Sequence, residues 1–482
     1  MASTQALPSE TLSTIFQLIL GQPPPQSNAI QLLAQHRARI HKLIELSLVC
    51  RQWRNTALGD GTLWTTLPVD TSHIDCQQST TTFLERSKQA MLDVSIVCDD
   101  DLDTTHETTF SEIIKNINRI KSLSFSTTSP GILRNLSVSA PNIETLDVFT
   151  AEQPAELGLL FGGNLPALRS LTLAGLPSWP LGLFSNLKDL YLVLPSSHPT
   201  VKVSSLIDIM SGSPGIKQIK MFGFLSIVDD SPPSSLAHLP NLQKFTMRDC
   251  DSATVLSHAI ILATADVKVV TYHQRMRAAM RIPSHDCHIL CLVPEDISTM
   301  GFLTGSTMFV LQQDHKIGFG VGFYRSRSSR PSLRIMDRSA SPVSFARRTF
   351  GVLADYPQYL RNIKDISIAL YTGGTVPWST LLRGFGQVER LSMIALHASS
   401  LLSALMVISE DGRPICPTLK QVDIHERGDG HVVVLDRDDM INFFAARRFL
   451  DCAALEVKIC GSGGDRSWKC RGSSGSTVET YV

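Results

Sequence analysis

The chain has 482 residues, of which 44 are basic and 44 acidic, so its formal net charge is zero. A chain without a net field does not attract nucleic acid or an anionic membrane as a whole, and we expect neither as a partner. The apolar content of 43% excludes wholesale disorder, and ten cysteines are too few for a disulfide scaffold.

Targeting signals are also missing from the sequence pattern. No segment approaches the run of about 18 apolar residues that crosses a bilayer. The first residues lack a basic stretch, and Glu10 stands where the apolar part of a secretory signal would begin. We therefore expect a protein of the cytoplasm, the nucleus or both.

The first predicted helix begins at Leu7-Pro8. Proline suits the first turn of a helix, because its missing N–H would have no partner there, and Glu10 favours the positive helix end. Apolar side chains then recur at helical spacing, and Gly21 with the following prolines ends the pattern. The members of this stripe are Leu12, Ile15, Phe16 and Ile19.

A second apolar stripe follows at the same spacing and ends at the glycines around Asp60. Its members are Leu46, Val49, Cys50, Trp53 and Ala57. The stretch Gly21–Lys42 between the stripes contains a proline-rich loop and an apolar-basic helix around Ile30–Ile40. A small helical bundle whose stripes pack together would by itself account for these residues.

The residue order is more specific than the spacing. The strings LPSETLSTIFQLIL and LIELSLVCRQWRNTAL, followed by Leu63-Trp64, resemble the F-box. The stretch Gly21–Lys42 is longer than in compact F-boxes. The resemblance implies a helical module over residues 1–68 that docks on the Skp adaptor of cullin–RING ubiquitin ligases. The side chains that would make or support this contact are Leu7, Pro8, Ile15, Phe16, Leu46, Val49, Cys50 and Trp53.

A six-residue pattern, apolar-x-x-apolar-x-apolar, recurs along the rest of the chain. Successive copies in the first group begin 19 to 29 residues apart. The last three positions read as a strand with its apolar side turned inward. The copies lie at 120–125, 143–148, 168–173, 187–192, 216–221, 242–247, 363–368, 388–393 and 419–424.

Helical patterns precede several of these strands, so each unit reads as helix, turn and strand. The predicted helices are Ser204–Met210, Ser252–Leu262, Trp378–Phe385, Ser399–Ile408 and Met440–Arg448. The period and the pattern resemble degenerate leucine-rich repeats, which implies an α/β solenoid with a parallel sheet over residues 69–460. An ordinary α/β domain with similar strands is the alternative.

Two segments depart from the repeat. Between residues 289 and 350 the pattern lapses, and alternating apolar residues at 317–323 and at Leu333 and Ile335 predict strand pairs that enter the solenoid or replace its helices. Residues 461–482 contain five glycines and five serines, which predicts a mostly disordered tail.

No metal or cofactor site is predicted. The segment His285–Cys291 holds two histidines and two cysteines, but structural zinc sites draw ligand pairs from separate segments. The glycines at 318, 320 and 322 alternate within a strand pattern and lack the helix that a dinucleotide-binding loop requires. No catalytic motif is present, so we do not expect an enzyme.

One segment carries an unusual charge. Residues 325–348 contain seven arginines and one aspartate. Arg325, Arg327 and Arg330 are therefore candidates for contact with an acidic target, and a solvated strand edge is the alternative.

Taken together, these expectations describe a substrate receptor of a cullin–RING ubiquitin ligase. The F-box would dock the Skp adaptor and through it the cullin, and the repeats would hold a target protein whose identity the sequence does not indicate. The alternative is a protein-binding scaffold without a ligase role.

Overall fold

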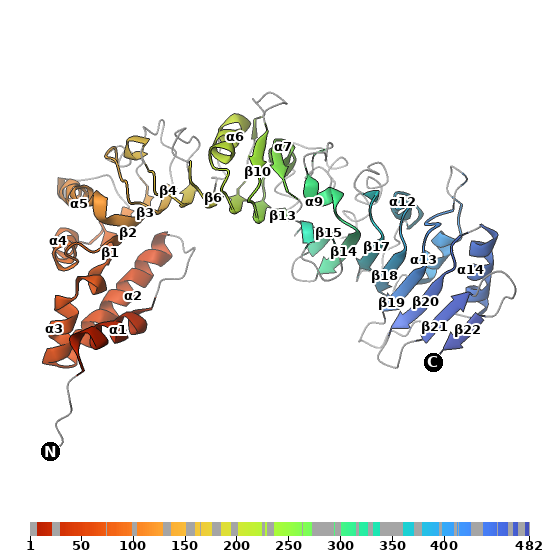
Figure 1. Ribbon diagram of the computed structural model, residues 1–482, viewed down its shortest axis with the longest axis horizontal. Helices are drawn as coiled ribbons and strands as arrows, with labels where there is room; N and C mark the ends of the chain where they lie inside the picture. Colours follow the sequence, from red (N-terminus) through yellow and green to blue (C-terminus); the bar gives the residue numbers. More distant parts are fainter. Residues whose placement is uncertain are drawn as a thin grey trace, which may run out of the picture. The chain divides into compact units, whose positions relative to one another are not determined.

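The structure of the protein is a computed structural model. It describes residues 7–21, 29–73, 75–98, 104–128, 136–150, 160–163, 165–175, 185–193, 201–223, 227–228, 236–262, 264–271, 294, 300–314, 318–325, 331–337, 360–370, 378–394, 398–408, 412, 414–425, 437–450, 452–460, 466–470 and 478–481. The chain divides into two compact units, Met1–Gly223 and Phe224–Val482. Both are mixed α/β structures built on parallel strands (Figure 1).

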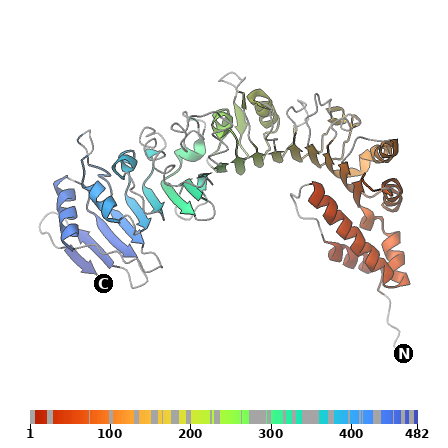
Figure 2. The same ribbon diagram turned by 180° about the vertical axis from the view of Figure 1, so that it is seen from behind.

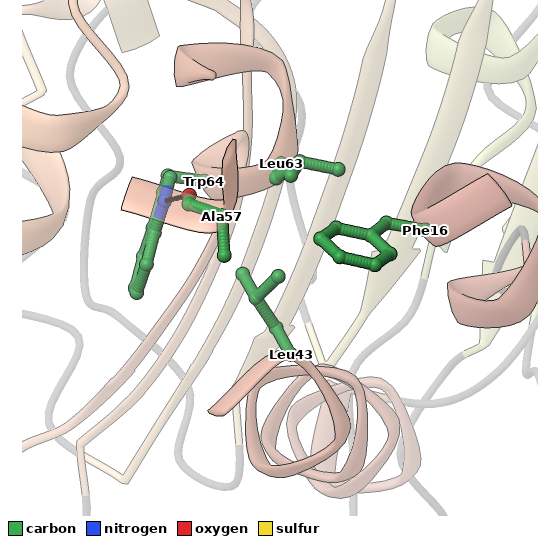
Figure 3. Packing of buried hydrophobic residues seen from close by; sticks show 5 residues of the cluster. All are labelled: Phe16, Leu43, Ala57, Leu63 and Trp64. Carbon is green, nitrogen blue, oxygen red and sulfur yellow. Dashed lines mark hydrogen bonds between the residues drawn. The ribbon is translucent and has the colours of Figure 1, made fainter. Parts of the chain in front are cut away.

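The first unit opens with helices α1 (Ser9–Leu20), α2 (Ala29–Leu48) and α3 (Arg51–Gly59) and the short 3-10 helix η1 (Gly61–Trp64). Their apolar stripes meet in one buried cluster (Figure 3). The indole N–H of Trp64 donates a buried hydrogen bond of 2.7 Å to the carbonyl of Ala57, so the aromatic ring is held by packing and by its polar atom. The cluster consists of Phe16, Leu43, Ala57, Leu63 and Trp64.

A parallel sheet follows in the same unit. Its strands are β1 (Thr66–Asp70), β2 (Leu92–Cys98), β3 (Ile120–Thr127), β4 (Thr145–Thr150), β5 (Ser170–Ala174), β6 (Asp189–Val193) and β8 (Gln218–Phe222), paired in that order. Between the strands lie α4 (Cys76–Arg86), α5 (Thr104–Lys115), η2 (Ile117–Arg119), η4 (Leu160–Gly163), the short strand β7 (Val201–Lys202) and α6 (Val203–Gly212).

The second unit contains a larger sheet. Its strands, in spatial order, are β11 (Lys244–Arg248), β13 (Asp266–Thr271), β16 (Pro331–Asp337), β15 (Gly318–Tyr324), β14 (Met308–Asp314), β17 (Asp365–Ala369), β18 (Arg390–Ile394), β19 (Gln421–His425), β20 (Glu456–Cys460), β21 (Arg466–Cys470) and β22 (Val478–Tyr481). Its helices are α7 (Ser252–Ser257), α9 (Gly301–Thr304), α12 (Trp378–Arg383), α13 (Ala398–Leu405) and α14 (Arg437–Phe449). Three shorter strands are β9 (Ile227–Val228), β10 (Ala237–Leu239) and β12 (Ala259–Ile261), of which β10 and β12 pair in parallel.

The recurring six-residue pattern corresponds to one repeated piece of structure. All three apolar positions of each of the nine copies are buried. The last two apolar residues of each copy lie in a strand. Backbone hydrogen bonds join the residues before this strand to the same positions of the preceding copy, such as Arg169 N–H to Glu144 C=O at 2.8 Å. The predicted strands and their inward register are therefore confirmed.

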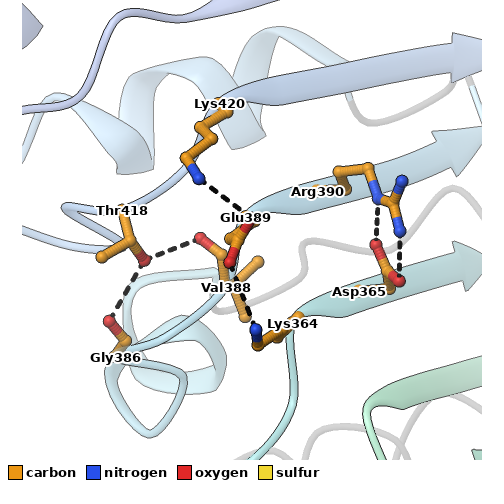
Figure 4. A network of polar contacts seen from close by, with 8 residues as sticks. All are labelled: Lys364, Asp365, Gly386, Val388, Glu389, Arg390, Thr418 and Lys420. Atoms are coloured by element: carbon orange, nitrogen blue, oxygen red, sulfur yellow. Dashed lines mark hydrogen bonds and ion pairs between the residues drawn. The ribbon is translucent and has the colours of Figure 1, made fainter. Parts of the chain in front are cut away.

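Charged side chains at the starts of neighbouring strands pair across the second unit (Figure 4). Glu389 lies between Lys364, at 3.7 Å, and Lys420, at 3.0 Å. Arg390 forms a two-pronged hydrogen-bonded ion pair with Asp365, a carboxylate that the sheet buries. These contacts raise the pKa of Arg390, chiefly through the hydrogen bonds from its guanidinium to Asp365. The register of the parallel strands brings these repeat positions together.

Several predicted boundaries differ from the structure. The second apolar stripe is not one helix, because Cys50 is extended and directly precedes α3. The helix predicted around Ile30–Ile40 continues through Leu48 as α2. The helix predicted over Ser252–Leu262 ends at Ser257, and its last residues form β12. Ala259–Ile261 pair in parallel with β10, and this tertiary contact overrides the local helical pattern.

The two irregular segments both add strands to the sheet. In the segment 289–350, the predicted strand pairs are present: β14, β15 and β16 pair antiparallel in sequence and lie within the sheet between β13 and β17. The tail 461–482, expected to be disordered, contains β21 and β22, which pair antiparallel at the edge of β20. The unpaired backbone N–H and C=O groups of an edge strand can bind a further strand. Amino-acid composition alone does not predict this pairing.

The predicted boundary at residue 68 does not coincide with the division into units. Helix α2 contacts β1, β2 and β3, which ties the helices to the first strands (Figure 2). Among the described residues, no helix has the length and apolar character needed to span a membrane.

Candidate protein-binding face

The eight residues predicted to contact an adaptor separate into two groups in the helical part of the first unit. Leu7, Pro8, Val49 and Cys50 are exposed. Phe16 is fully buried, and the other three, Ile15, Leu46 and Trp53, are half-buried. The first group is able to touch a partner directly, and Phe16 and Trp53 support the helices from inside.

The supporting group is held by aromatic contacts. The rings of Phe16 and Trp53 lie 5.1 Å apart in an edge-to-face arrangement. Trp64 makes a similar contact with Phe83 of α4, also at 5.1 Å, and the guanidinium of Arg86 lies 4.4 Å from the Trp64 ring centroid. Such pairs add about 0.5–1.5 kcal/mol beyond simple burial, so the helices form a rigid base for the exposed residues.

Exposed apolar side chains are concentrated on these helices. Of the thirteen large hydrophobic residues that are exposed among the described residues, seven lie in the first 58 residues. These seven are Leu7, Leu18, Ile19, Ile44, Leu48, Val49 and Leu58. A concentration of this kind marks an interaction site more often than isolated surface leucines do.

Two separate segments of this exposed set meet at the start of α3. The side-chain amide of Gln52 donates a hydrogen bond of 2.5 Å to the carbonyl of Leu7, which ties the segment before α1 to α3. Val49 and Cys50 immediately precede α3 and lie within one turn of Gln52. We name the exposed residues Leu7, Pro8, Ile44, Leu48, Val49 and Cys50 the apolar face.

The sequence reasoning did not include Ile44 and Leu48. They are 46% and 65% exposed and lie four residues apart, so they share one side of α2. Their position relative to Leu43 could have identified them. Leu43 lies on the side of α2 that faces the helical core, whereas Ile44 and Leu48 lie outside that stripe.

A polar cleft lies beside the apolar face, between α1 and α3. It has a volume of about 740 Å³ and is lined by Ser9, Glu10, Ser13, Arg51, Gln52, Asn55, Thr56, Gly59 and Asp60. Asp60 accepts hydrogen bonds from the hydroxyl of Ser13 and from the backbone N–H of Thr62, the latter at 2.8 Å. Desolvation opposes ionisation of Asp60, but these hydrogen bonds hold its pKa below the usual range. The ionised carboxylate therefore fixes α1 against η1.

The other end of α2 is anchored on the sheet. His36 is buried, and its Nδ1 atom lies 2.9 Å from the hydroxyl oxygen of Ser95 on β2. Arg37 forms an ion pair with Asp70 at the end of β1. Burial, and secondarily the charge of Arg39, lower the pKa of His36 to about 4, so its imidazole is neutral at physiological pH. A single helix thus carries part of the apolar face and the contact with the first strands.

The arginines proposed for target contact are only partly described. Arg325 is half-buried, and its carbonyl accepts a hydrogen bond of 2.5 Å from the hydroxyl of Thr307. Arg327 and Arg330 lie outside the described residues, as does the segment His285–Cys291 that was weighed as a zinc site. Within the described part of the chain, no group of three or more His, Cys, Asp or Glu side chains is placed to hold a metal ion.

Comparison with known proteins adds no assignment. No protein-family model matches the sequence, and no curated protein matches it.

Proposed function

We propose that the protein is a substrate receptor of a cullin–RING ubiquitin ligase, in which the apolar face binds a Skp-family adaptor. The observation that carries the proposal is the exposure of Leu7, Pro8, Val49 and Cys50 beside a core of the buried Phe16 and Trp64 and the half-buried Trp53. These residues are among the positions at which the sequence resembles the F-box. The exposed residues are able to contact a partner, and the aromatic residues pack beneath them.

The proposed mechanism is proximity. The helical part docks the adaptor and through it the cullin, while the repeats that resemble leucine-rich repeats bind a target protein. Holding the target near the ubiquitin-conjugating enzyme raises the effective concentration of its lysines, so transfer becomes intramolecular in character. No catalytic residue of this chain takes part in this mechanism, and no cofactor is needed.

The anchoring of α2 supports this role. Because His36 and Arg37 join α2 to β2 and β1, the helix that carries Ile44 and Leu48 cannot turn freely with respect to the first strands. A fixed connection of this kind gives the ligase a defined distance between the adaptor and the beginning of the target-binding sheet.

The test is binding of the purified full chain to a Skp-family adaptor. We expect Leu48→Asp with Val49→Asp to weaken binding by at least about tenfold, because a charge placed in a desolvated apolar contact costs more than 1.4 kcal/mol. Val138→Asp is the matched control, since Val138 is 46% exposed and lies outside the helical part. Equal binding by all three proteins, each with native circular dichroism, would contradict the proposal.

Co-elution of the cullin distinguishes the ligase from the alternative scaffold. A ligase receptor brings the cullin with the adaptor in a three-component size-exclusion experiment. A scaffold that uses its helices only to bind the adaptor elutes without the cullin.

A further inference from the structure

The sheet of the first unit has two faces, and α2 lies on one of them. In β2, Val94 and Ile96 point to the opposite face from Ser95, because side chains alternate along a strand. Ile96 is in register with Phe125 of β3, whose ring packs against Phe110 of α5 at 5.8 Å. Ser95 contacts His36 of α2. Helices α5 and α2 therefore cover opposite faces, and we name the second one the α2 face.

Two rows of side chains cross the α2 face in register. The first row is Ser95, Ser124, Asp147, Thr172, Tyr191 and Lys220. The second row is Val97, Ser126, Phe149, Ala174, Val193 and Phe222. Ser95 and Ser124 are 0% and 1% exposed, whereas the four following members of the first row are half-buried. Among the described residues, the members of this row on β4 to β8 are therefore less completely buried than Ser95 and Ser124.

On β4 to β8, the second row is apolar. Phe149, Ala174, Val193 and Phe222 lie on consecutive strands and are all half-buried. The ring of Tyr191 packs 5.1 Å from that of Phe222. Side chains in these positions do not build the core, which lies on the other face, so the row is available for contact with another segment.

The flank of the row is basic. Arg169, Lys188 and Lys217 are exposed and directly precede β5, β6 and β8, and Lys220 lies 5.7 Å from the centroid of the Tyr191 ring. Asp189 is the one carboxylate at the beginning of these three strands. Desolvation raises the pKa of Asp147, and a hydrogen bond involving Thr172 acts against this rise.

The spacing of the row suits a helix. Neighbouring strands lie about 4.8 Å apart, and helix positions three or four residues apart are about 4.5–6 Å apart along the axis. A helix laid across the strands therefore presents one side chain to each strand. Helix α2 already contacts β1, β2 and β3, with His36 against Ser95 of β2. An extended segment repeats its side chains every 6.6–6.8 Å and does not match this spacing.

We propose that the α2 face over β4–β8 binds an amphipathic helix of the target protein, with an apolar stripe on Phe149, Val193 and Phe222 and carboxylates toward Lys188 and Lys217. This occupant continues, across the same sheet, the helix-on-strand contact that α2 already makes. The inference rests on the proposed function for the role of the bound helix as a target, but the binding itself is measured separately from adaptor binding.

The test uses the full chain and a fluorescein-labelled synthetic helix of about five turns, with leucines at i, i+3 or i+4 and i+7 and glutamates along one flank. Two further peptides have the same composition in scrambled order, or lysine in place of glutamate. Anisotropy is measured for wild type, for Lys188→Glu with Lys217→Glu, and for Val193→Asp. The matched control, Lys115→Glu with Arg361→Glu, makes the same charge change at two exposed positions, one on α5 and one in the second unit.

We expect the wild type and the control to bind the patterned peptide at least about tenfold more tightly than either comparison peptide, and both face variants to lose about tenfold. Equal binding of patterned and scrambled peptides, or equal loss in the control, would overturn the inference. A dimer in sedimentation that the face variants abolish would also overturn it, because the occupant would then be a second copy. If the adaptor binds and the peptide does not, the inference fails alone; if the peptide binds and the adaptor does not, the proposed function fails.

Discussion

The imidazole of His36 and the hydroxyl of Ser95 meet at 2.9 Å between α2 and β2, and both side chains are fully buried. This hydrogen bond joins the helix that carries part of the apolar face to the sheet that we propose as the target-binding part. Its polar atoms satisfy each other in a place where an unpaired group would cost about 1–3 kcal/mol.

The first prediction concerns acid stability. The pKa of His36 is lowered from 6.5 to about 4 in the folded protein, so the unfolded state binds the proton more readily between these values. Stability from this group is complete above pH 6.5, falls as the pH drops toward 4 and is lost below it, by a total of about 3 kcal/mol. Urea midpoints of wild type and His36→Gln at pH 7.5, 6, 5 and 4.5 measure the effect.

Comparison with the variant removes other contributions. Asp93 has a raised pKa because of desolvation, so its protonation acts in the opposite direction, but it is present in both proteins. Parallel pH profiles for wild type and His36→Gln would contradict the prediction.

The second prediction concerns the helical core. Trp64→Phe removes the indole N–H and leaves the buried carbonyl of Ala57 without its 2.7 Å hydrogen bond. We expect a loss of about 1–3 kcal/mol in the free energy of unfolding. Trp53→Phe is the control, since this half-buried residue contributes mainly its ring contact with Phe16 and should lose less. Chemical denaturation followed by circular dichroism compares the two, and a greater loss for Trp53→Phe would be inconsistent with the role of Trp64.

The third prediction tests the register of the repeats. Leu171→Asp places a carboxylate at a position that is 1% exposed, next to Leu146 and Leu190 on the adjacent strands. We expect a loss above about 4 kcal/mol and local unfolding, because a buried unpaired charge is among the most destabilising changes. The neighbouring Ser170→Asp, on the other face of the same strand, should be tolerated. Equal melting temperatures for the two variants would show that the register is incorrect.

The fourth prediction concerns the turn after β5. Gly175 has a φ of +82°, and a Cβ added there would lie 2.0 Å from the carbonyl oxygen of Thr150. Gly175→Ala should therefore destabilise the first unit by at least about 1–3 kcal/mol. Gly59→Ala, at a helical position with no neighbour within 4 Å of the added Cβ, should be neutral or slightly stabilising. Thermal melts of both variants provide the comparison.

The sequence by itself determined the parts that depend on local periodicity. The pattern Leu168-x-x-Leu171-x-Leu173 already specifies a strand with its inner face, because alternation at period two and burial of apolar surface leave one register. The same reasoning located α1 and the buried Phe16. The resemblance to the F-box also depended on sequence alone, and it stays a proposal about function.

Only the tertiary structure decided where α2 lies and what remains uncovered. Nothing in the order of residues 29–48 shows that His36 meets Ser95, because the contact joins segments 59 residues apart through a face of the sheet that reads as polar. The same holds for Phe149 and Phe222, which become one row only when parallel pairing aligns their strands. The alternation of apolar residues within one segment predicts which side of a strand is buried. The face of the sheet that a helix covers depends instead on packing between segments that are distant in the sequence.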